Sequence, residues 1–199
     1  MPFNNIQSQT KSPGIVLGLL NIIYMQTIVT NKQRKRIASS KTFTSLLQIA
    51  MKSITTARKK YKGAKVIELC APISSGGKGS VEANLAEMNK AIEMLKKLNY
   101  ILFSQMPYEE KIGELKKEQE KKTKRKLAYN MNVLLDFYEP LFEKGYTDML
   151  VFLPGWESSI GASWEHTKGK ILGIKIRQLK DNWAELIANG EKDIKKLTF

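Results

Sequence analysis

The stretch TDMLVFLPGWESSIGASWE, residues 147–165, carries the strongest structural signal in the chain. Within it, residues 149–153 form a short continuous apolar run, which is typical of a strand buried on both faces. The Pro-Gly-Trp that follows, residues 154–156, predicts a turn. Ser159 is a residue type that caps helices, so we expect a helix from there to about Lys170.

The same order of strand, loop and helix occurs earlier in the chain. Residues 65–70 (KVIELC) form a β-rich run, and the Gly- and Ser-bearing loop 71–79 follows them. A helix capped at Ser80 is predicted by apolar residues with 4-3-4-3 spacing: Val81, Leu85, Met88, Ile92 and Leu95. Residues 100–103 (YILF) predict the next strand, and residues 171–176 form another apolar segment.

Strands that alternate with helices predict a parallel sheet with helices on both faces. We therefore expect an α/β fold of the flavodoxin-like or Rossmann-like kind, with about five strands. Ligands of such sheets bind beyond the carboxyl ends of the strands. The loops at residues 71–79 and 154–161 both lie at those ends.

The remaining stretches predict helices or solvated chain. Residues 109–126 (EEKIGELKKEQEKKTKRK) are almost all charged, and we interpret them as a solvated helix face or a mobile loop. Residues 127–142 predict a second amphipathic helix, which Pro140 must kink or restart. A last helix is indicated by the apolar residues Leu179, Trp183, Leu186 and Ile187.

The charge of the chain is unevenly distributed. The 199 residues have a formal net charge of +14, and twelve of the 33 Lys and Arg residues precede Glu68, the first acidic residue. The remaining 21 bases are nearly balanced by 19 acids. We therefore divide the chain into a basic N-terminal extension, residues 1–63, partly disordered or helical, and an α/β domain, residues 64–199. Within the extension, residues 41–58 have helix-like apolar spacing.

The extension also contains an apolar run, residues 13–29. It is short for a membrane span, and its positive charges follow it rather than precede it. We expect the extension to pack on the domain or on a partner subunit of a cytoplasmic protein. A membrane anchor, an organelle-targeting segment and a nucleic-acid tether are the alternatives. The single cysteine, Cys70, and single histidine, His166, lead us to expect no disulfide, metal site or cofactor.

The loop and helix after residue 153 place two chemical groups at a fixed spacing. The start of a helix capped at Ser159 has free N–H groups and a partial positive charge, which suit a phosphate. Gly161 lets a ligand approach the first turn closely. Glu165 lies six residues beyond the cap, about 9 Å along the axis, so a carboxylate and an anion site are one sugar ring apart. The Ser-Ser-Gly-Gly loop at residues 74–77 adds a second set of backbone donors.

These segments together resemble the nucleoside 2-deoxyribosyltransferase superfamily. The resemblance rests on residues 71–77 (APISSGG), residues 100–104 (YILFS) and, above all, residues 147–165, and it covers about residues 64–180. It is closest to the branch with a Leu-Pro-Gly-Trp-Glu-x-Ser-x-Gly-Ala-x-x-Glu motif, and it extends to the deoxynucleoside 5′-phosphate N-hydrolases. Relatives of this class build active sites at subunit contacts, so the resemblance implies a homo-oligomer.

The resemblance also implies roles for single residues. Glu165 corresponds to the glutamate that attacks C1′ and forms a glycosyl–enzyme ester, and Ser159 to the serine that contacts a 5′-phosphate. The second carboxylate, which orients the sugar and handles the proton of the base, is Asp136, with Glu139 as its competitor. The first loop departs from the family pattern because it begins with Ala-Pro and lacks an arginine, for which Lys78 would have to substitute.

We therefore expect cleavage of the N-glycosidic bond of a 2′-deoxynucleoside or its 5′-monophosphate, by a hydrolase or a deoxyribosyltransferase. The alternatives are a non-catalytic nucleotide-binding or regulatory protein on the same fold, and a nucleic-acid- or membrane-tethered protein that acts through its basic N-terminal third. The residues expected to bind the substrate or its phosphate are Ser74, Ser75, Gly76, Gly77, Ser159 and Gly161.

Other conspicuous residues receive structural interpretations. Asp148 precedes a strand, where we expect a turn residue rather than a catalyst. Trp156 and Trp164 are expected to pack against other side chains. His166 is expected to be a bystander, because adjacent helix residues point about 100° apart. The tyrosines assigned to the core are Tyr129 and Tyr138.

Overall fold

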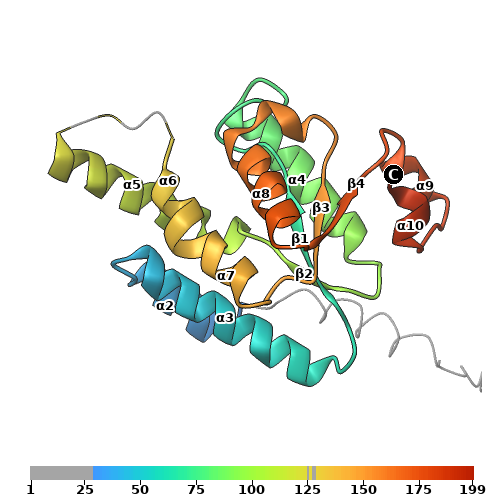
Figure 1. Ribbon diagram of the computed structural model, residues 1–199, viewed down its shortest axis with the longest axis horizontal. Helices are drawn as coiled ribbons and strands as arrows, with labels where there is room; N and C mark the ends of the chain where they lie inside the picture. The colour runs from blue at the N-terminus through green and yellow to red at the C-terminus, as the bar shows by residue number, and fades with distance from the viewer. Residues whose placement is uncertain (1–28, 125, 127–128) are drawn as a thin grey trace, which may run out of the picture.

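A computed structural model describes residues 29–124, 126 and 129–199 of the chain (Figure 1). Its centre is a sheet of four strands: β1 (Val66–Cys70), β2 (Ile101–Phe103), β3 (Met149–Phe152) and β4 (Lys175–Gln178). The order across the sheet is β2-β1-β3-β4, and every neighbouring pair is parallel. The predicted α/β class with a parallel sheet is therefore confirmed. The described part of the chain supplies four strands, where about five were expected.

The apolar segment at residues 171–176 becomes a strand only at its end. Helix α8 (Ile160–Ile171) runs into the segment, and Gly173 then turns the chain with a φ of +67°. Glycine adopts this left-handed conformation without steric cost. Strand β4 begins two residues later and pairs with β3 at the edge of the sheet, which explains why its residues are half-exposed or exposed.

The sheet has a topological switch point between β1 and β3. The chain leaves β1 toward β2 on one side, and it later passes from β3 to β4 on the other. The last residues of the two strands, Cys70 and Phe152, lie in register. The loops that follow them therefore meet over the point where ligands bind in open α/β sheets.

Alternate strand residues point into two separate cores. On one face, residues such as Phe103 and Leu150 pack under α3 (Phe43–Lys60), α8 and the helical segment that precedes β3. On the other face, residues such as Ile67 and Val151 pack under a second set of helices. These are α4 (Val81–Leu95), α9 (Trp183–Ala188) and α10 (Ile194–Leu197). In Figure 1, α3 of the first set and α9 and α10 of the second lie at opposite sides of the strands.

Part of the predicted N-terminal extension is helical. It contains α2 (Asn31–Ala38) and α3, and α3 confirms the helix predicted from residues 41–58. Its cap is Thr42, whose hydroxyl accepts the N–H of Ser45. The buried residues of α3 belong to the same core as the sheet. Apart from Val29, the apolar run at residues 13–29 lies outside the described residues. No helix in the described part is both long and apolar enough to cross a membrane.

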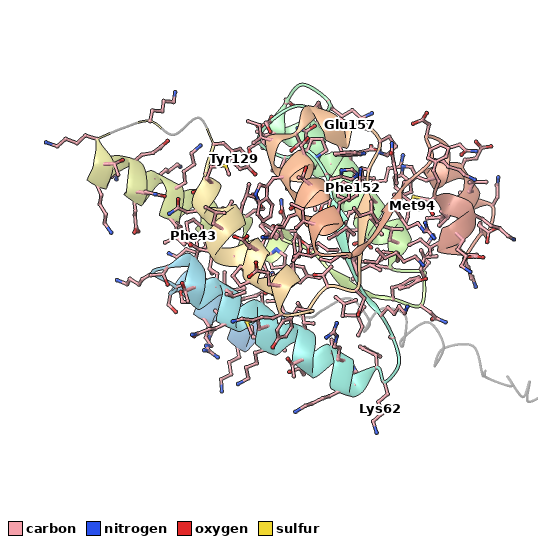
Figure 2. All side chains as sticks on the ribbon, in the orientation of Figure 1. Phe43, Lys62, Met94, Tyr129, Phe152 and Glu157 are labelled. Atoms are coloured by element: carbon pink, nitrogen blue, oxygen red, sulfur yellow. The ribbon has the colours of Figure 1, made fainter. Side chains whose placement is uncertain are left out.

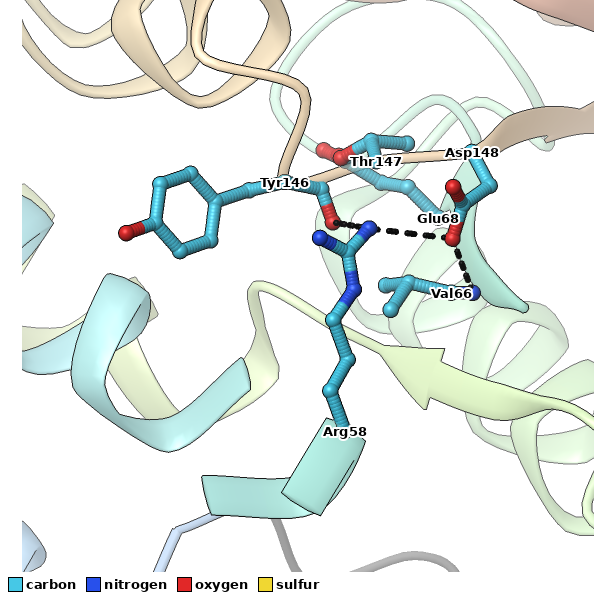
Figure 3. A network of polar contacts seen from close by, with 6 residues as sticks. All are labelled: Arg58, Val66, Glu68, Tyr146, Thr147 and Asp148. Carbon is cyan, nitrogen blue, oxygen red and sulfur yellow. Dashed lines mark hydrogen bonds and ion pairs between the residues drawn. The ribbon is translucent and has the colours of Figure 1, made fainter. Parts of the chain in front are cut away.

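A polar network joins the end of α3 to the start of β3 (Figure 3). The guanidinium of Arg58 donates to the carbonyl of Tyr146 at 3.2 Å and to Asp148 Oδ2 at 3.0 Å. The same carboxylate oxygen accepts the N–H of Val66 at 2.7 Å. Asp148 is thus engaged by backbone and side-chain donors at the strand start, in agreement with its structural interpretation.

The chain between β2 and β3 forms helices that pack in the same core as α3 and α8. Its elements are η1 (Met106–Tyr108), α5 (Glu109–Thr123), α6 (Met131–Val133), η2 (Leu134–Tyr138) and α7 (Glu139–Glu143). Pro140 has no N–H to donate and therefore interrupts the α-helical pattern. The helix adjusts by one π-helical turn, η2, in which the N–H of Glu139 donates to the carbonyl of Leu134. Of the kink or restart predicted at Pro140, the structure shows a restart, since α7 begins at Glu139.

Candidate active site

A small pocket of about 140 Å³ opens beside the first turns of α8. Ser159 caps this helix as predicted, because its hydroxyl accepts the N–H of Ala162 at 3.3 Å. Glu165 lies on the next turns of the same helix and is only 6% exposed, yet it lines the pocket. The two groups that the sequence placed one sugar ring apart therefore share one cavity.

Gly161 leaves room for the Tyr129 side chain in this wall. A Cβ at Gly161 would lie 2.3 Å from the hydroxyl oxygen of Tyr129, far inside van der Waals contact. Tyr129, labelled in Figure 2, lies just before α6 and also lines the pocket. Tyr129 and Tyr138, which we assigned to the core, are thus both pocket residues, although Tyr138 is also buried in the core cluster.

The opposite wall comes from α5, inside the stretch that we interpreted as a solvated face or loop. Four of its residues line the pocket: Glu109, Ile112, Gly113 and Lys116. Their spacing of three, four and seven residues puts them on one side of a helix. The sequence contains this spacing, but we did not predict an inward face because most of the neighbouring residues are charged. Most of the other α5 side chains are exposed or half-exposed, so the interpretation holds for the outer face only.

Burial controls the ionisation of Glu165. Removal from water raises the pKa of Glu165 to about 8, a hydrogen bond from the Cys70 thiol lowers it, and the charge of Glu109 raises it. Burial also raises the pKa of Cys70 well above its usual value. Near neutral pH the Glu165 carboxyl is therefore poised to hold or release a proton.

A second buried carboxyl lies behind the pocket. Glu68 on β1 is 3% exposed, and the hydroxyl of Thr147 donates to its Oε2 at 3.1 Å. Burial raises the pKa of Glu68 well above its usual value, and the charge of Glu165 raises it further. Because two buried carboxylates repel one another, we expect Glu68 and Glu165 to share at most one negative charge near neutral pH.

A third carboxyl faces the same pocket. Glu109 lies at the start of α5, and burial raises its pKa to about 7. Among the described residues, no hydrogen-bond donor or cation pairs with it. A carboxyl of this kind exchanges protons at neutral pH, which suits general acid and base catalysis.

The structure separates the predicted second carboxylates from the pocket. Asp136 is exposed, and Glu139 forms an ion pair with Lys168. Neither residue lines the pocket. The π-helical turn explains this placement. Val133 and Tyr138, at the two ends of the turn, line the pocket, whereas Asp136 between them faces solvent. The carboxyl that lines the pocket together with Glu165 is that of Glu109.

The predicted binding loop divides into two parts. Ser74 lines the pocket together with Ser159 and Gly161, as expected. The other residues tie the two loops to one another. Ser75 Oγ accepts the N–H of Ile160 at 3.2 Å, and the N–H of Gly77 donates to Ser158 Oγ at 2.8 Å.

Close packing of the two loops explains the paired glycines. A Cβ on Gly76 would lie 2.2 Å from the carbonyl oxygen of Ser158, and Gly76 also has a φ of +67°. Gly77 and Lys78 line a separate cavity of about 540 Å³ on the far side of the loop. Lys78 therefore does not supply a cation to the Glu165 pocket, whereas Lys116 does.

The aromatic residues near the motif pack as predicted. The rings of Trp156 and His166 lie 4.3 Å apart, and both contact Phe152. Trp164 stacks on Phe142 with centroids 6.2 Å apart. None of these side chains lines the Glu165 pocket. They pack against one another around residues 152–166 and do not form the surface of the pocket.

Comparison of the chain with models of known protein families, with curated proteins and with solved structures finds no match.

Proposed function

We propose that the chain cleaves the N-glycosidic bond of a 2′-deoxynucleoside or its 5′-monophosphate, with Glu165 as the nucleophile. The observation that carries the proposal is the buried carboxyl of Glu165, in one pocket with the helix cap Ser159 and a second, unpaired carboxyl, Glu109. Two carboxyl groups in different environments are the usual equipment for hydrolysis of a glycosidic bond.

In the first step, the ionised carboxylate of Glu165 attacks C1′ of the deoxyribose. The C1′–N bond breaks, and its electron pair leaves with the base, which takes a proton from Glu109. The products of this step are the free base, a glycosyl ester on Glu165 and an ionised Glu109. Near neutral pH, Glu109 with its pKa of about 7 is partly protonated and Glu165 with its pKa of about 8 is partly ionised. The reacting form, with a carboxylate on Glu165 and a proton on Glu109, is therefore a minority of the protein at this pH.

In the second step, water or another base attacks C1′ of the ester. Glu109 accepts the proton of the attacking group, and Glu165 leaves as a carboxylate. Two displacements at C1′ retain the configuration of the sugar. Burial raises the pKa of Glu68 and so favours its protonated form, which limits the negative charge beside the Glu165 carboxylate.

The phosphate of a 5′-monophosphate would lie at the start of α8. Ser159, Gly161 and Ser74 line the pocket there, and Lys116 lines it from the opposite wall. The N–H groups of Ile160 and Ala162 are already hydrogen-bonded to serine hydroxyls. The helix start thus offers fewer free donors than the sequence led us to expect, and Lys116 becomes the cation for this end of the substrate.

The proposal is tested by incubating the chain with the four 2′-deoxynucleosides and their 5′-monophosphates and measuring the free base by chromatography. We expect release of base from at least one substrate and none from the Glu165→Gln variant. A glycosyl ester on Glu165, trapped by acid quench and found by mass spectrometry, is the expected intermediate. Absence of base release from all eight compounds would overturn the proposal in favour of a non-catalytic nucleotide-binding protein.

A further inference from the structure

Among the residues that the structure describes, two asparagines are buried, and their hydrogen bonding differs completely. Asn84 on α4 and Asn130 before α6 are 5% and 6% exposed. The amide of Asn84 is fully used: its Nδ2 donates to the carbonyls of Ile73 and Gly76, each at 3.0 Å, and its Oδ1 accepts the N–H of Lys78 at 2.7 Å. Within the described residues, neither Nδ2 nor Oδ1 of Asn130 has a hydrogen-bond partner.

Local structure does not account for the amide of Asn130. The residue is the N-cap of α6, a position where asparagine normally accepts a backbone N–H through its side chain. Here its backbone carbonyl accepts the N–H of Val133 at 3.1 Å, but its side chain makes no cap hydrogen bond. A buried amide without partners destabilises the folded chain, so such a group needs a reason.

The position of Asn130 supplies that reason, because it lines the same pocket as Glu165 and Glu109. The pocket contains one other carboxamide, Gln105, and its Oε1 already accepts the hydroxyl of Tyr138. Asn130 is therefore the carboxamide of the described pocket lining whose donor and acceptor both lack a protein partner.

A carboxamide presents an N–H donor and a C=O acceptor side by side. Nucleobase edges present the complementary pair, as the N6 and N7 atoms of adenine do toward asparagine. We propose that Asn130 reads the base of the substrate through two hydrogen bonds to an adjacent donor and acceptor on one edge. The inference rests on the proposed function, and it adds a specificity-determining residue to it.

Binding requires a small movement of the amide. The Nδ2 and Oδ1 atoms are shielded from solvent, so a base engages them when the side chain turns about its two torsions. The ligand then supplies the partners that the protein lacks. A base that lacks an adjacent donor and acceptor would leave the amide unpaired and would bind weakly.

The experiment compares Asn130→Leu with Asn84→Leu, the same substitution at an equally buried asparagine that is fully hydrogen-bonded. The first readout is the Tm of the ligand-free proteins. Because Asn130→Leu removes an unpaired amide, we expect its Tm to rise by about 2–4 °C. Asn84→Leu leaves three backbone groups without partners, and its Tm should fall. A fall for Asn130→Leu would show a structural role and would overturn the inference.

The second readout is binding of free adenine, cytosine, hypoxanthine and thymine, measured by calorimetry on the intact chain. We expect at least one base to bind the wild type, and Asn130→Leu to weaken its Kd about tenfold or more. Unchanged affinity, or no binding of any base to the wild type, would overturn the inference. Because free bases need no bond cleavage, base binding that depends on Asn130 in a chain without base release would overturn the proposed function alone.

Discussion

The two walls of the pocket are built in different ways. The α8 wall is short and local: a capping serine, a glycine and a glutamate follow one another within seven residues, from Ser159 to Glu165. The α5 wall draws on a 15-residue helix of mostly charged residues, from which one stripe turns inward. The difference teaches that the proposed nucleophile belongs to a local motif, whereas its partner groups depend on how a distant helix packs.

The largest effect is expected on the α8 wall. Glu165→Ala should reduce base release by at least about 10³-fold, because loss of a covalent nucleophile removes the reaction path itself. Lys170→Ala, an exposed position on the same helix, serves as the control and should keep wild-type turnover. The measurement is kcat/KM for base release. Turnover of Glu165→Ala within about tenfold of wild type would remove Glu165 from the chemistry.

The next largest effect tests the α5 wall. Glu109→Gln should lower kcat about 10²-fold and remove the limb of the pH profile near pH 7, because glutamine cannot transfer the proton. Asp136→Asn and Glu139→Gln should stay within about twofold of wild type, since neither residue lines the pocket. The measurement is kcat for base release of each variant as a function of pH, from pH 5 to 9. If Asp136→Asn has the larger effect, the sequence-based assignment was right and Glu109 is not the proton donor.

The stability of the folded chain should also depend on pH, because Glu165 is buried. Its pKa in the folded chain, about 8, is above the ordinary value of 4.5, so the folded state binds this proton more tightly than the unfolded state. The stability that this contributes is present below about pH 4.5 and is lost as the pH rises through about 8. The raised pKa of Glu68 acts in the same direction.

Glu165→Gln removes one of these titrations. We expect the decline of its Tm between pH 5 and 8 to be shallower than that of the wild type, and its Tm at pH 8 to be higher. The exposed Glu157→Gln should retain the wild-type slope. Equal slopes for Glu165→Gln and the wild type would mean that Glu165 is already ionised in the folded chain.

Local patterns predicted the strands and caps well, because their causes lie within a few residues. The continuous apolar run at residues 149–153 and the serine at 159 specify β3 and the start of α8 by themselves. The inward stripe of α5 could not be separated from its charged surroundings, since its burial depends on where the sheet places that helix. The unpaired amide of Asn130 was equally hidden, because a sequence does not show which polar groups lack partners.

The placement of Asp136 outside the pocket has a related cause. The family resemblance suggested an acid on the helix before β3, but the π-helical turn before Pro140 changes which residues face the pocket. Pro140 predicted a kink or a restart of the helix, and a restart is observed, but the extra residue in the turn was not predicted. A change of one residue in helical phase is enough to turn a carboxylate from the pocket to solvent.

The smallest effect is expected far from both walls, at the network in Figure 3 that joins α3 to the sheet. Asp148→Ala should lower the free energy of unfolding by about 1–2 kcal/mol, because it leaves the N–H of Val66 and the guanidinium of Arg58 without this acceptor. Arg58→Ala should cost less, since the Arg58–Asp148 ion pair is over a third exposed at both side chains and such pairs contribute little. Urea denaturation measures both changes, and kcat/KM for base release should stay at the wild-type value in each variant. A loss of activity in Asp148→Ala that exceeds its loss of folded protein would place the network, and with it α3, in the chemistry of the pocket.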